Sequence, residues 1–468
     1  MYMLLLMGLL AMAGCIITQR IEIFSFIVLS PVALLILLYA IEKPLFSFIL
    51  FSVTTGYFSA IYRYASIEGL SVLLDCSLAF CLTTIIINVI ANRESFLWKN
   101  GFNILTLTQI VWVCYCFFIL LTPQAKMENL IGNRSVFITL PLTYFISGIL
   151  LCSKKKLRMT LFLIALFAIT AFIKVYWQKT HGFDYAERAW LIQGAWHTHL
   201  LRSGIRYFSF FTDAGNFGSC MGMLTIVFAI IAATARRKRA IIFYGAIAIV
   251  ACICMMLSGT RGAMVVPLGG LVLFLLLSKS VKIITISAVI GTLIFCFFYF
   301  TDMGNGNPFI RRMRTAFRPT EDASFNVRLG NQKRFAYYLK DKPFGVGVGG
   351  TIVDTEELMK LNEEFIPTDS YYVGIWVEGG IVGLCLYITL QVLILLRCCY
   401  ILMFKIKNKQ LMLILSALLC GVFGIWLNGY VGRGMGFQPS SFLIAVFLSF
   451  VLNGPYIDRQ LKPEEKIL

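Results

Sequence analysis

The chain has 468 residues and a formal net charge of +18, and its composition is 59% hydrophobic but only 14% charged. Soluble domains contain about 45–50% apolar and about 25% charged residues, so this composition excludes an ordinary soluble protein. The positive charge does not indicate nucleic-acid binding, because much of it forms short clusters between apolar runs: "KKKLR" (154–158), "ARRKR" (235–239), "KSVK" (279–282) and "KIKNK" (405–409). Such clusters are typical of the positive-inside bias of membrane proteins.

Apolar runs of about 17–25 residues recur along the whole chain, and each can cross a hydrocarbon core of about 30 Å as a helix. We therefore predict an all-α fold, a polytopic helical membrane protein with one integral membrane domain over residues 1–468 and about 14 transmembrane spans (12–14). The predicted spans are centred near residues 10, 31, 52, 80, 113, 143, 167, 226, 249, 270, 291, 384, 420 and 445.

The basic clusters define the predicted topology. All of them fall on one face, and tracing the spans outward from them puts both termini in the cytoplasm. The first apolar run has no basic residues before it and a second follows at once, so we do not expect a removable signal peptide. The polar segments 123–134, 176–217, 301–370 and 429–437 then lie on the extracytoplasmic face.

Two extracytoplasmic segments are too long to be simple connections. Segment 176–217 holds all three histidines, whose irregular spacing predicts no metal site. Segment 301–370 is expected to be a large, partly helical loop, and its part between residues 311 and 342 has nine Lys or Arg residues against three acids. Long translocated segments escape the positive-inside bias, so this basic patch indicates an anionic ligand.

Arg261 lies in the turn "SGTRG" between two predicted spans. A charge inside a membrane is costly and marks a functional candidate, but this one falls at the outer end of its helix and can reach the interface. A purely structural role therefore stays open. The flanking Gly259 and Gly262 favour a tight turn that approaches a ligand, where the guanidinium can bind a phosphate through two hydrogen bonds.

A second candidate stretch, "IRYFSFFTDAGNFGSCMGM" (205–223), enters the eighth predicted span, centred near residue 226, from its outer side. Arg206 precedes an aromatic run and the polar turn that contains Asp213 and Asn216. Either Asp213 or Asn216 can cap the following helix or contact a ligand, and a helix N-terminus on this face also favours an anion.

The third stretch, "NVRLGNQKRFAYYLKDKPFGVGVGG" (326–350), predicts an amphipathic helix that carries Arg328, Lys333 and Arg334 and ends at the proline and glycines. The glycine pattern is not a dinucleotide-binding motif, because no strand–turn–helix context surrounds it. We predict a flexible or ligand-approaching loop around Gly347.

The fourth stretch, "PTDSYYVGIWVEGGIVGL" (367–384), begins the span after the large loop. Asp369 is either the N-cap of this helix or a general base kept ionised by nearby cations. Glu378 lies two to three turns further on, and we expect it to face the interior of the bundle, because a lipid-facing carboxylate is costly.

Together these stretches resemble the O-antigen ligase and polymerase superfamily of bacterial membrane glycosyltransferases. The resemblance rests on "SGTRG" at the end of a span, Arg206 with "FFTDAGNFG", the large outer loop with Arg328 and "PFGVGVG", and the following "DSY…EGGIVG" helix. It covers roughly residues 200–385. The resemblance implies catalytic roles for Arg206, Arg261 and Asp369 and substrate binding by a further set: Asn216, Arg328, Lys333, Arg334, Gly347, Ser370, Tyr371 and Glu378.

The resemblance also implies a reaction. Members of this superfamily use a glycan linked to undecaprenyl pyrophosphate as donor at the outer face of the bacterial cytoplasmic (inner) membrane. A sugar hydroxyl of a glycan acceptor attacks the anomeric carbon, and the lipid pyrophosphate leaves. No metal, nucleotide sugar or other cofactor is implied. The expected partners are the lipid-linked donor, the acceptor and the bilayer, together with a flippase and a chain-length regulator, and no nucleic acid.

Two alternatives stay open beside a polymerase of repeat units for O-antigen, capsule or exopolysaccharide. The ligase branch, which transfers a glycan to lipid-A core or protein, typically has a histidine where this chain has Asp369, whereas polymerases often have "D-N/S-x-Y" there. A non-enzymatic polysaccharide or lipid transporter is the second alternative. It is disfavoured because the chain has no visible internal repeat and few polar residues near the predicted bilayer midplane.

Overall fold

The computed structural model describes residues 31, 34–65, 69–91, 96–121, 133–201, 204–278, 281–304, 306–314, 323–349, 368, 370–461 and 467. These residues form helices with short connections. The strands among them are two strands of two residues each, which pair as one hairpin, so the predicted all-α class is confirmed. In chain order the helices and strands are α3 (Pro44–Ala65), α4 (Val72–Ala91), α5 (Trp98–Gly101), α6 (Ile104–Ile119), η1 (Ser135–Thr139), α8 (Leu140–Leu150), α9 (Lys154–His181), α10 (Tyr185–Trp190), η2 (Leu191–Ala195), α11 (Trp196–His199), β1 (Leu200–Leu201), β2 (Gly204–Ile205), α12 (Ala214–Thr234), α13 (Lys238–Leu257), η3 (Arg261–Met264), α14 (Val265–Leu277), α15 (Val281–Phe300), α16 (Pro308–Arg314), α17 (Ala323–Tyr338), α20 (Tyr371–Phe404), α21 (Lys409–Asn428), η6 (Gly434–Gly436), α22 (Ser440–Leu452) and α23 (Gly454–Arg459).

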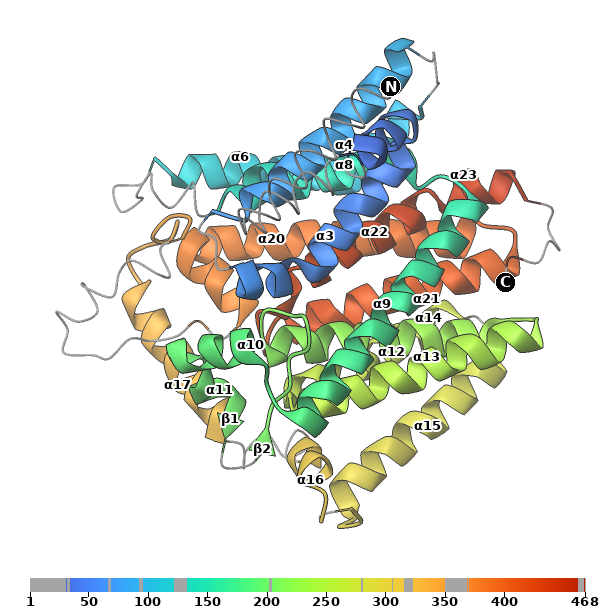
Figure 1. The fold of residues 1–468 in the computed structure, drawn as a ribbon. Coiled ribbons are helices and arrows are strands. Elements are labelled where there is room, and N and C mark those ends of the chain that lie inside the picture. The colour runs from blue at the N-terminus through green and yellow to red at the C-terminus, as the bar shows by residue number, and fades with distance from the viewer. Residues whose placement is uncertain are drawn as a thin grey trace, which may run out of the picture. The chain divides into compact units, whose positions relative to one another are not determined.

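The chain divides into two compact units (Figure 1). The first contains residues 1–54 and 71–96, and the second contains residues 55–70 and 97–468. In the first unit the Asn88 side-chain amide in α4 donates to the Thr84 carbonyl at 2.8 Å and also to the carbonyl of Ile41. The described residues of the candidate sites all belong to the second unit.

Seven helices of the described chain are long and apolar enough to cross a membrane: α3, α4, α9, α12, α13, α20 and α21. Shorter apolar helices lie at 104–119, 135–150, 261–277, 291–300 and 440–452. Helices therefore occupy twelve of the predicted centres, from residue 52 to residue 445. The centre at residue 10 lies outside the described residues, and residue 31 is at their edge. A 13-residue helix such as α22 is only about 20 Å long, less than the hydrocarbon core. The count of about 14 spans thus stays a prediction, whereas a membrane protein with multiple apolar helices is confirmed.

The core of the second unit is built around α12 and α21, the candidate spans that the rest of the structure buries most completely. α12 packs against α13, α14 and α21, and α14 packs against α21. Small residues make this approach possible: a Cβ on Gly424 of α21 would collide with the carbonyl group of Val266 in α14. Close packing at small residues is how helices associate where no water drives them together.

α20 is broken at Gly380, where φ is +65°. The loop that follows α17 binds at this break. The amides of Val346 and Gly347 donate to the carbonyls of Val377 and Glu378, both at 3.0 Å, and so satisfy groups that the break takes out of the helical pattern. Gly345, with φ of +72°, lies so close to the Glu378 and Gly380 backbones that a Cβ would collide with them.

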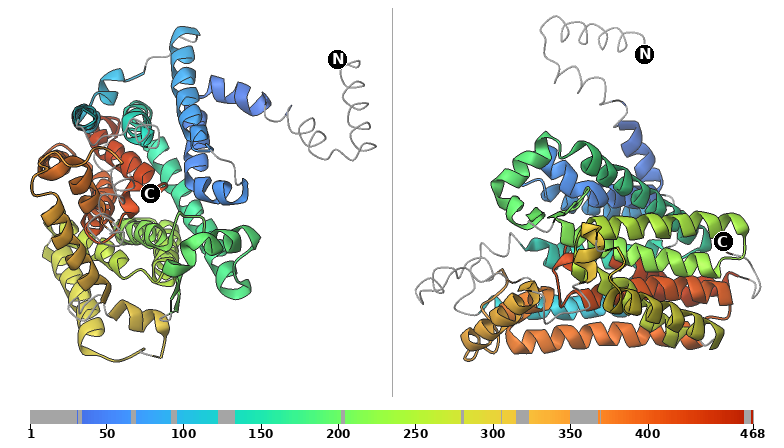
Figure 2. Two further views of the ribbon diagram at one scale, coloured as in Figure 1. Left: turned by 90° about the vertical axis from the view of Figure 1, so that its left-hand side faces the viewer. Right: turned by 90° about the horizontal axis from the view of Figure 1, so that it is seen from below.

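Several connecting elements gather at one end of the second unit, the left-hand end in Figure 1, and the view from below in Figure 2 agrees. They are α10, α11, the β1–β2 hairpin and α17. The N-termini of α12, α14, α20 and α22 lie at the same end. Two of the outer segments predicted from hydropathy, 176–217 and 301–370, supply these connecting elements.

Candidate functional site

α12 begins in the polar turn that the sequence analysis singled out. Asp213 is its N-cap: the Asp213 carboxylate accepts hydrogen bonds from the amides of Gly215 at 2.6 Å and Asn216 at 3.0 Å. His199 binds the same helix end, because its Nε2 accepts the Ala214 amide at 3.1 Å. The capping alternative predicted for Asp213 is therefore the one found in the structure.

His199 is neutral in this arrangement. Its Nε2 accepts a hydrogen bond from a backbone amide, so the proton lies on Nδ1, which donates to the Ala195 carbonyl at 2.9 Å. Burial lowers the pKa of this histidine from its usual 6.5 to about 4, and the positive charges of Arg206 and Arg63 act in the same direction. His199 thus has a structural role that sequence reasoning did not identify.

Arg206 follows the hairpin and binds residues on both sides of it in the sequence. Its Nη1 donates to the Thr198 carbonyl at 3.0 Å, and its Nη2 donates to the Thr260 hydroxyl at 2.9 Å. Thr260 is the central residue of the "SGTRG" turn, and its hydroxyl in turn donates to the Ala214 carbonyl at 2.8 Å. One hydroxyl group therefore links Arg206, the first residue of α12 and the turn that carries Arg261.

The "SGTRG" turn has the tight geometry that its glycines predicted, but only one of them makes the turn. Gly259 has φ of +58°, and the Ser258 hydroxyl accepts the Thr260 amide at 3.1 Å. Gly262 instead allows close approach to the end of α21, because a Cβ there would lie 2.7 Å from Val431 Cγ1. Its close neighbour is thus the protein itself, and Arg261 opens the short helix η3.

Arg206 lies within electrostatic range of two arginines from other elements, Arg261 and Arg328. Burial lowers the pKa of Arg206, the positive charges of Arg261 and Arg328 lower it further, and Asp213 opposes them. Arg206, Arg261 and Arg328 are all half-buried. In the described chain, the Nε atoms of Arg206 and Arg328 are buried without a hydrogen-bond partner. The structure therefore brings together three of the predicted residues as a cationic cluster with buried N–H donors to spare, which we call the arginine cluster.

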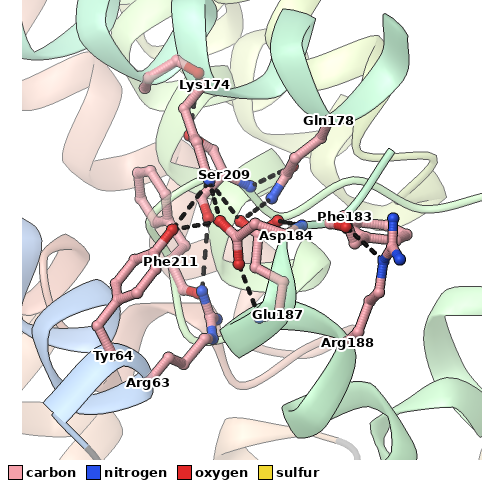
Figure 3. Close-up of polar contacts among 11 residues, drawn as sticks. Arg63, Tyr64, Lys174, Gln178, Phe183, Asp184, Glu187, Arg188, Ser209 and Phe211 are labelled. Atoms are coloured by element: carbon pink, nitrogen blue, oxygen red, sulfur yellow. Dashed lines mark hydrogen bonds and ion pairs between the residues drawn. The ribbon is translucent and has the colours of Figure 1, made fainter. Parts of the chain in front are cut away.

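The chain segment that carries Arg206 into α12 is held by Arg63, near the end of α3 (Figure 3). The Arg63 guanidinium donates to the carbonyls of Ser209 at 3.4 Å and Thr212 at 3.1 Å, and to that of Phe211. It lies 4.5 Å from the ring centroid of Trp190 and 4.6 Å from that of Phe208. Such cation–π contacts strengthen when the cation is shielded from water, and Arg63 is only 8% exposed.

A second polar network joins α9 and α10 to the same segment (Figure 3). Lys174 pairs with Asp184 at 2.7 Å and with Glu187 at 2.9 Å. Gln178 donates to Glu187 at 2.8 Å and accepts the Ser209 amide at 3.0 Å. Ser209 has φ of +50°, a conformation that costs free energy for a residue with a side chain. These contacts fix the backbone that leads from Arg206 to the α12 N-terminus.

The structure does not place the other two predicted cations of α17, Lys333 and Arg334, in the arginine cluster. Both lie on the same helix as Arg328, but both are exposed. The helix itself is confirmed, and it ends at Tyr338, before the glycine-rich loop. Its end packs on α20 through a cluster of Phe335, Leu339, Val346, Val373 and Val377.

Asn216 and Ser370 use their side chains within the protein. The Asn216 amide donates to Thr212 at 3.0 Å and to the Gln438 carbonyl at 2.8 Å, and its oxygen accepts from Ser440 at 2.6 Å. Ser370 is the N-cap of α20: its hydroxyl accepts the Val373 amide at 3.4 Å and donates to the Gly429 carbonyl at 3.0 Å. The cap predicted for Asp369 is therefore supplied by its neighbour. Asp369 itself lies outside the described residues.

Gly347 and Glu378 meet at the break in α20. The Gly347 amide is bound to the Glu378 carbonyl, so the close approach predicted for this loop is to the protein's own helix. A substrate contact at Gly347 stays a prediction. Glu378 lines a cavity inside the bundle, in line with the expectation that it faces away from lipid.

This cavity has a volume of about 350 Å³ and lies between α6, η1, α8, α20, α21, η6 and α22. Tyr371, Glu378 and Arg433 contribute to its wall, and Tyr371 interacts electrostatically with both of the charged side chains. Arg433 also donates to the Thr368 hydroxyl at 3.4 Å. Sequence reasoning placed segment 429–437 on the outer face but missed Arg433, although a cation between glycines in "GYVGRGMG" resembles the "SGTRG" pattern.

No curated protein matches the chain. Residues 246–388 match the family model described as O-Antigen ligase. The matched part begins inside α13 and contains "SGTRG", α17, the glycine-rich loop and the broken half of α20. It includes Arg261 and Arg328 of the arginine cluster, whereas Arg206 lies before it. The resemblance inferred from the motifs is thus confirmed: residues 246–388 are similar to the O-antigen ligase family, which supports the O-antigen ligase and polymerase superfamily.

Proposed function

We propose that this protein is a membrane glycosyltransferase that polymerises oligosaccharide repeat units linked to undecaprenyl pyrophosphate. The reaction takes place on the outer face of the bacterial cytoplasmic membrane and extends an O-antigen, capsule or exopolysaccharide. The observation that carries the proposal is the arginine cluster: three cations from β2–α12, η3 and α17, with buried N–H donors on Arg206 and Arg328. Such a group suits a diphosphate, which presents several anionic oxygens to guanidinium donors.

The arginine cluster acts on the leaving group in this proposal. A hydroxyl of the acceptor sugar attacks the anomeric carbon of the donor, the new glycosidic bond forms, and the bond from that carbon to the diphosphate oxygen breaks. Negative charge develops on the departing lipid diphosphate, and preorganised cations stabilise that charge in the transition state. The chain needs no metal or nucleotide for this step, since the arginines supply the positive charge.

The acceptor hydroxyl must also lose a proton. We assign this proton to the carboxylate of Asp369, next to the α20 N-cap, with Ser370 and Tyr371 beside it in the chain. Lys333, Arg334 and Gly347 complete the set proposed to contact substrate, the two cations by attracting the anionic donor to the end of the bundle. A flippase and a chain-length regulator are the expected protein partners, because repeat units must reach the outer face before they are joined.

The arginine variants test the proposal directly. The full-length protein is reconstituted into liposomes with lipid-linked repeat units, and the products are separated by size. Arg261→Ala should abolish the ladder of longer chains on undecaprenol, and Arg261→Lys should restore little of it, because lysine lacks the planar two-pronged donor. Arg188→Ala is the matched control: Arg188 is an exposed arginine of α10 at the same end of the unit. A complete ladder from Arg261→Ala would exclude the pyrophosphate role.

The products also separate the alternatives. A ligase would join the glycan to a foreign acceptor such as lipid-A core and would give no ladder on undecaprenol. A transporter would move lipid-linked glycan between leaflets with no new glycosidic bond.

For Asp369, the Asn variant retains the size and polarity of the side chain but not its basicity. If Asp369 is the general base, Asp369→Asn should lose activity.

A further inference from the structure

The cavity beside the break in α20 has a wall of unusual chemistry for the interior of a helical bundle. Many of the residues that line it are apolar, such as Leu390, Ile394 and Leu448. Amides, hydroxyls and charges lie among them, on residues such as Gln109, Tyr144, Glu378 and Arg433. Pockets for small ligands combine apolar and aromatic side chains with a few polar groups that orient the ligand, so this lining suits a ligand that has both apolar faces and hydrogen-bonding groups.

Aromatic rings supply a second feature of the wall. The rings of Trp112 and Tyr387 meet edge to face with centroids 4.9 Å apart, and those of Tyr387 and Tyr371 lie 5.9 Å apart. The hydroxyls of Tyr371 and Tyr387 are 3.4 Å from each other. Flat apolar ring faces beside hydroxyl and amide groups match a sugar, which has apolar C–H faces and a rim of hydroxyls. The volume of about 350 Å³ is in the range of small-molecule pockets.

The position of the cavity relates it to the arginine cluster. Segment 428–440 lies between the two. On one side Gly262 packs against Val431 and Asn428, and Asn216 binds the Gln438 carbonyl. On the other side Arg433, Met435 and Phe437 line the cavity. The cavity wall also includes Val348, Tyr371 and Glu378, which lie within the residues that match the O-antigen ligase family model.

We propose that this cavity is a saccharide-binding subsite, which takes sugar units of the acceptor glycan while the arginine cluster holds the donor diphosphate. The proposal rests on the proposed function for the identity of the glycan. Glu378 and Arg433 bind sugar hydroxyls, the carboxylate as acceptor and the guanidinium as donor, and the aromatic rings contact the C–H faces. The charged and polar groups in the wall disfavour the isoprenoid chain of the lipid, which can make no hydrogen bonds.

Direct binding can be measured without activity, because Trp112 and Trp426 line the cavity and report on its contents by their fluorescence. The full-length protein in nanodiscs is titrated with lipid-free repeat-unit oligosaccharide, released by mild acid from its undecaprenyl-pyrophosphate carrier. We expect a saturable change in tryptophan fluorescence. Gly374→Leu should raise the Kd about 10-fold or more, because Gly374 lines the cavity and its new side chain occupies that space.

Gly374 suits this test because a Cβ there would meet only Arg433 Nη2, at 4.0 Å. The matched control is Gly245→Leu in α13, where a Cβ would meet only the Cβ of Ala232, at 3.9 Å, and which does not line the cavity. Its Kd should equal that of the unchanged protein. If Gly374→Leu does not fold, Glu378→Gln serves instead: it keeps the side-chain size, removes the charge, and should weaken binding about 3- to 10-fold.

The outcomes separate this proposal from the proposed function. Oligosaccharide binding that is absent, or equally strong in the cavity variants, overturns the saccharide subsite and leaves the Arg261→Ala ladder test untouched. A fluorescence response to undecaprenyl phosphate that Gly374→Leu abolishes also overturns it, because the cavity then holds lipid. Conversely, oligosaccharide binding that Gly374→Leu weakens supports the subsite even if Arg261→Ala still makes polymer.

Discussion

The hydroxyl of Thr260 offers a sharp test of how the arginine cluster is held. It accepts a hydrogen bond from Arg206 Nη2 at 2.9 Å and donates to the Ala214 carbonyl at 2.8 Å. Thr260→Val keeps the shape of the side chain and removes both hydrogen bonds. Ala214 is the first residue of α12, so its carbonyl keeps the helical hydrogen bond that α12 provides. The main loss is therefore the anchoring of Arg206.

The size of the effect follows from the charge of the donor. A hydrogen bond to a charged group contributes about 1.5–3 kcal/mol, and each 1.4 kcal/mol corresponds to a factor of ten in rate. If Arg206 acts in the transition state, Thr260→Val should lower the rate of polymer formation by about 10- to 150-fold. Thr260→Ser keeps the hydroxyl and should retain most of the activity. The loss should appear in kcat rather than in KM, since the donor still meets Arg261 and Arg328.

The assay is the rate of ladder formation in liposomes, with the amount of folded protein checked by size-exclusion chromatography. Thr225→Val is the control, because the Thr225 hydroxyl donates to the Met221 carbonyl at 2.7 Å within α12, away from the arginines. A wild-type rate for Thr260→Val, or an equal loss in Thr225→Val, would refute the reasoning that Arg206 must be held in this position.

Three further predictions concern the structure that supports the site. The pKa of His199 is lowered to about 4 in the folded chain, so its ring stays neutral there, whereas the ring in the unfolded chain takes up a proton near pH 6.5. The contribution of His199 to the free energy of unfolding should be complete above pH 6.5 and fall by up to about 3 kcal/mol as the pH drops toward 4. In thermal unfolding across this range, the midpoint should depend less steeply on pH in His199→Gln than in the unchanged protein. Arg63→Met should destabilise the protein by about 2–4 kcal/mol, because three backbone carbonyls lose a buried donor, whereas Arg397→Met, an exposed arginine of α20, should change the unfolding midpoint little. Gly345→Ala should increase proteolysis of the loop after α17, because the added methyl group collides with the α20 backbone. Gly330→Ala is the control and should leave proteolysis unchanged, since a Cβ at Gly330 meets nothing within 4 Å. Equal cleavage of the two variants would contradict the docking of this loop at the break in α20.

Hydropathy predicted the helices well because a helix that crosses a membrane needs a long, continuous run of apolar residues. Runs of apolar residues around residues 226, 249 and 420 became α12, α13 and α21. The amphipathic helix with Arg328 and the turn with Arg261 were also predictable, since local residue spacing determines both. The break in α20 had a visible signal as well, the pair Gly379–Gly380 inside an apolar run, but two glycines alone do not indicate which one turns the chain.

No pattern in the sequence predicted the residues that hold the arginine cluster in place. Arg63 contacts Ser209 and Phe211 from a distance of more than 140 positions along the chain, and Thr260 contacts Ala214 across 46. No local pattern marks these partners, because the contact depends on how α3, α12 and α13 pack. His199 is a similar case: the spacing of the three histidines gave no signal for its structural role, because only the fold brings its ring to the α12 N-terminus.

The division between the two proposed subsites bears on the choice between polymerase and ligase. Both enzymes use the same lipid-diphosphate donor, so the arginine cluster serves either one and cannot separate them. They differ in the acceptor, which is another repeat unit for a polymerase and lipid-A core or protein for a ligase. On our proposals the acceptor occupies the cavity on the other side of segment 428–440, and the Tyr371 amide is tied to that segment through the Gly429 carbonyl at 2.9 Å. The specificity of the enzyme therefore resides in the residues that line this cavity, Glu378 and Arg433 foremost, and the nature of its acceptor should be sought there rather than at the arginines.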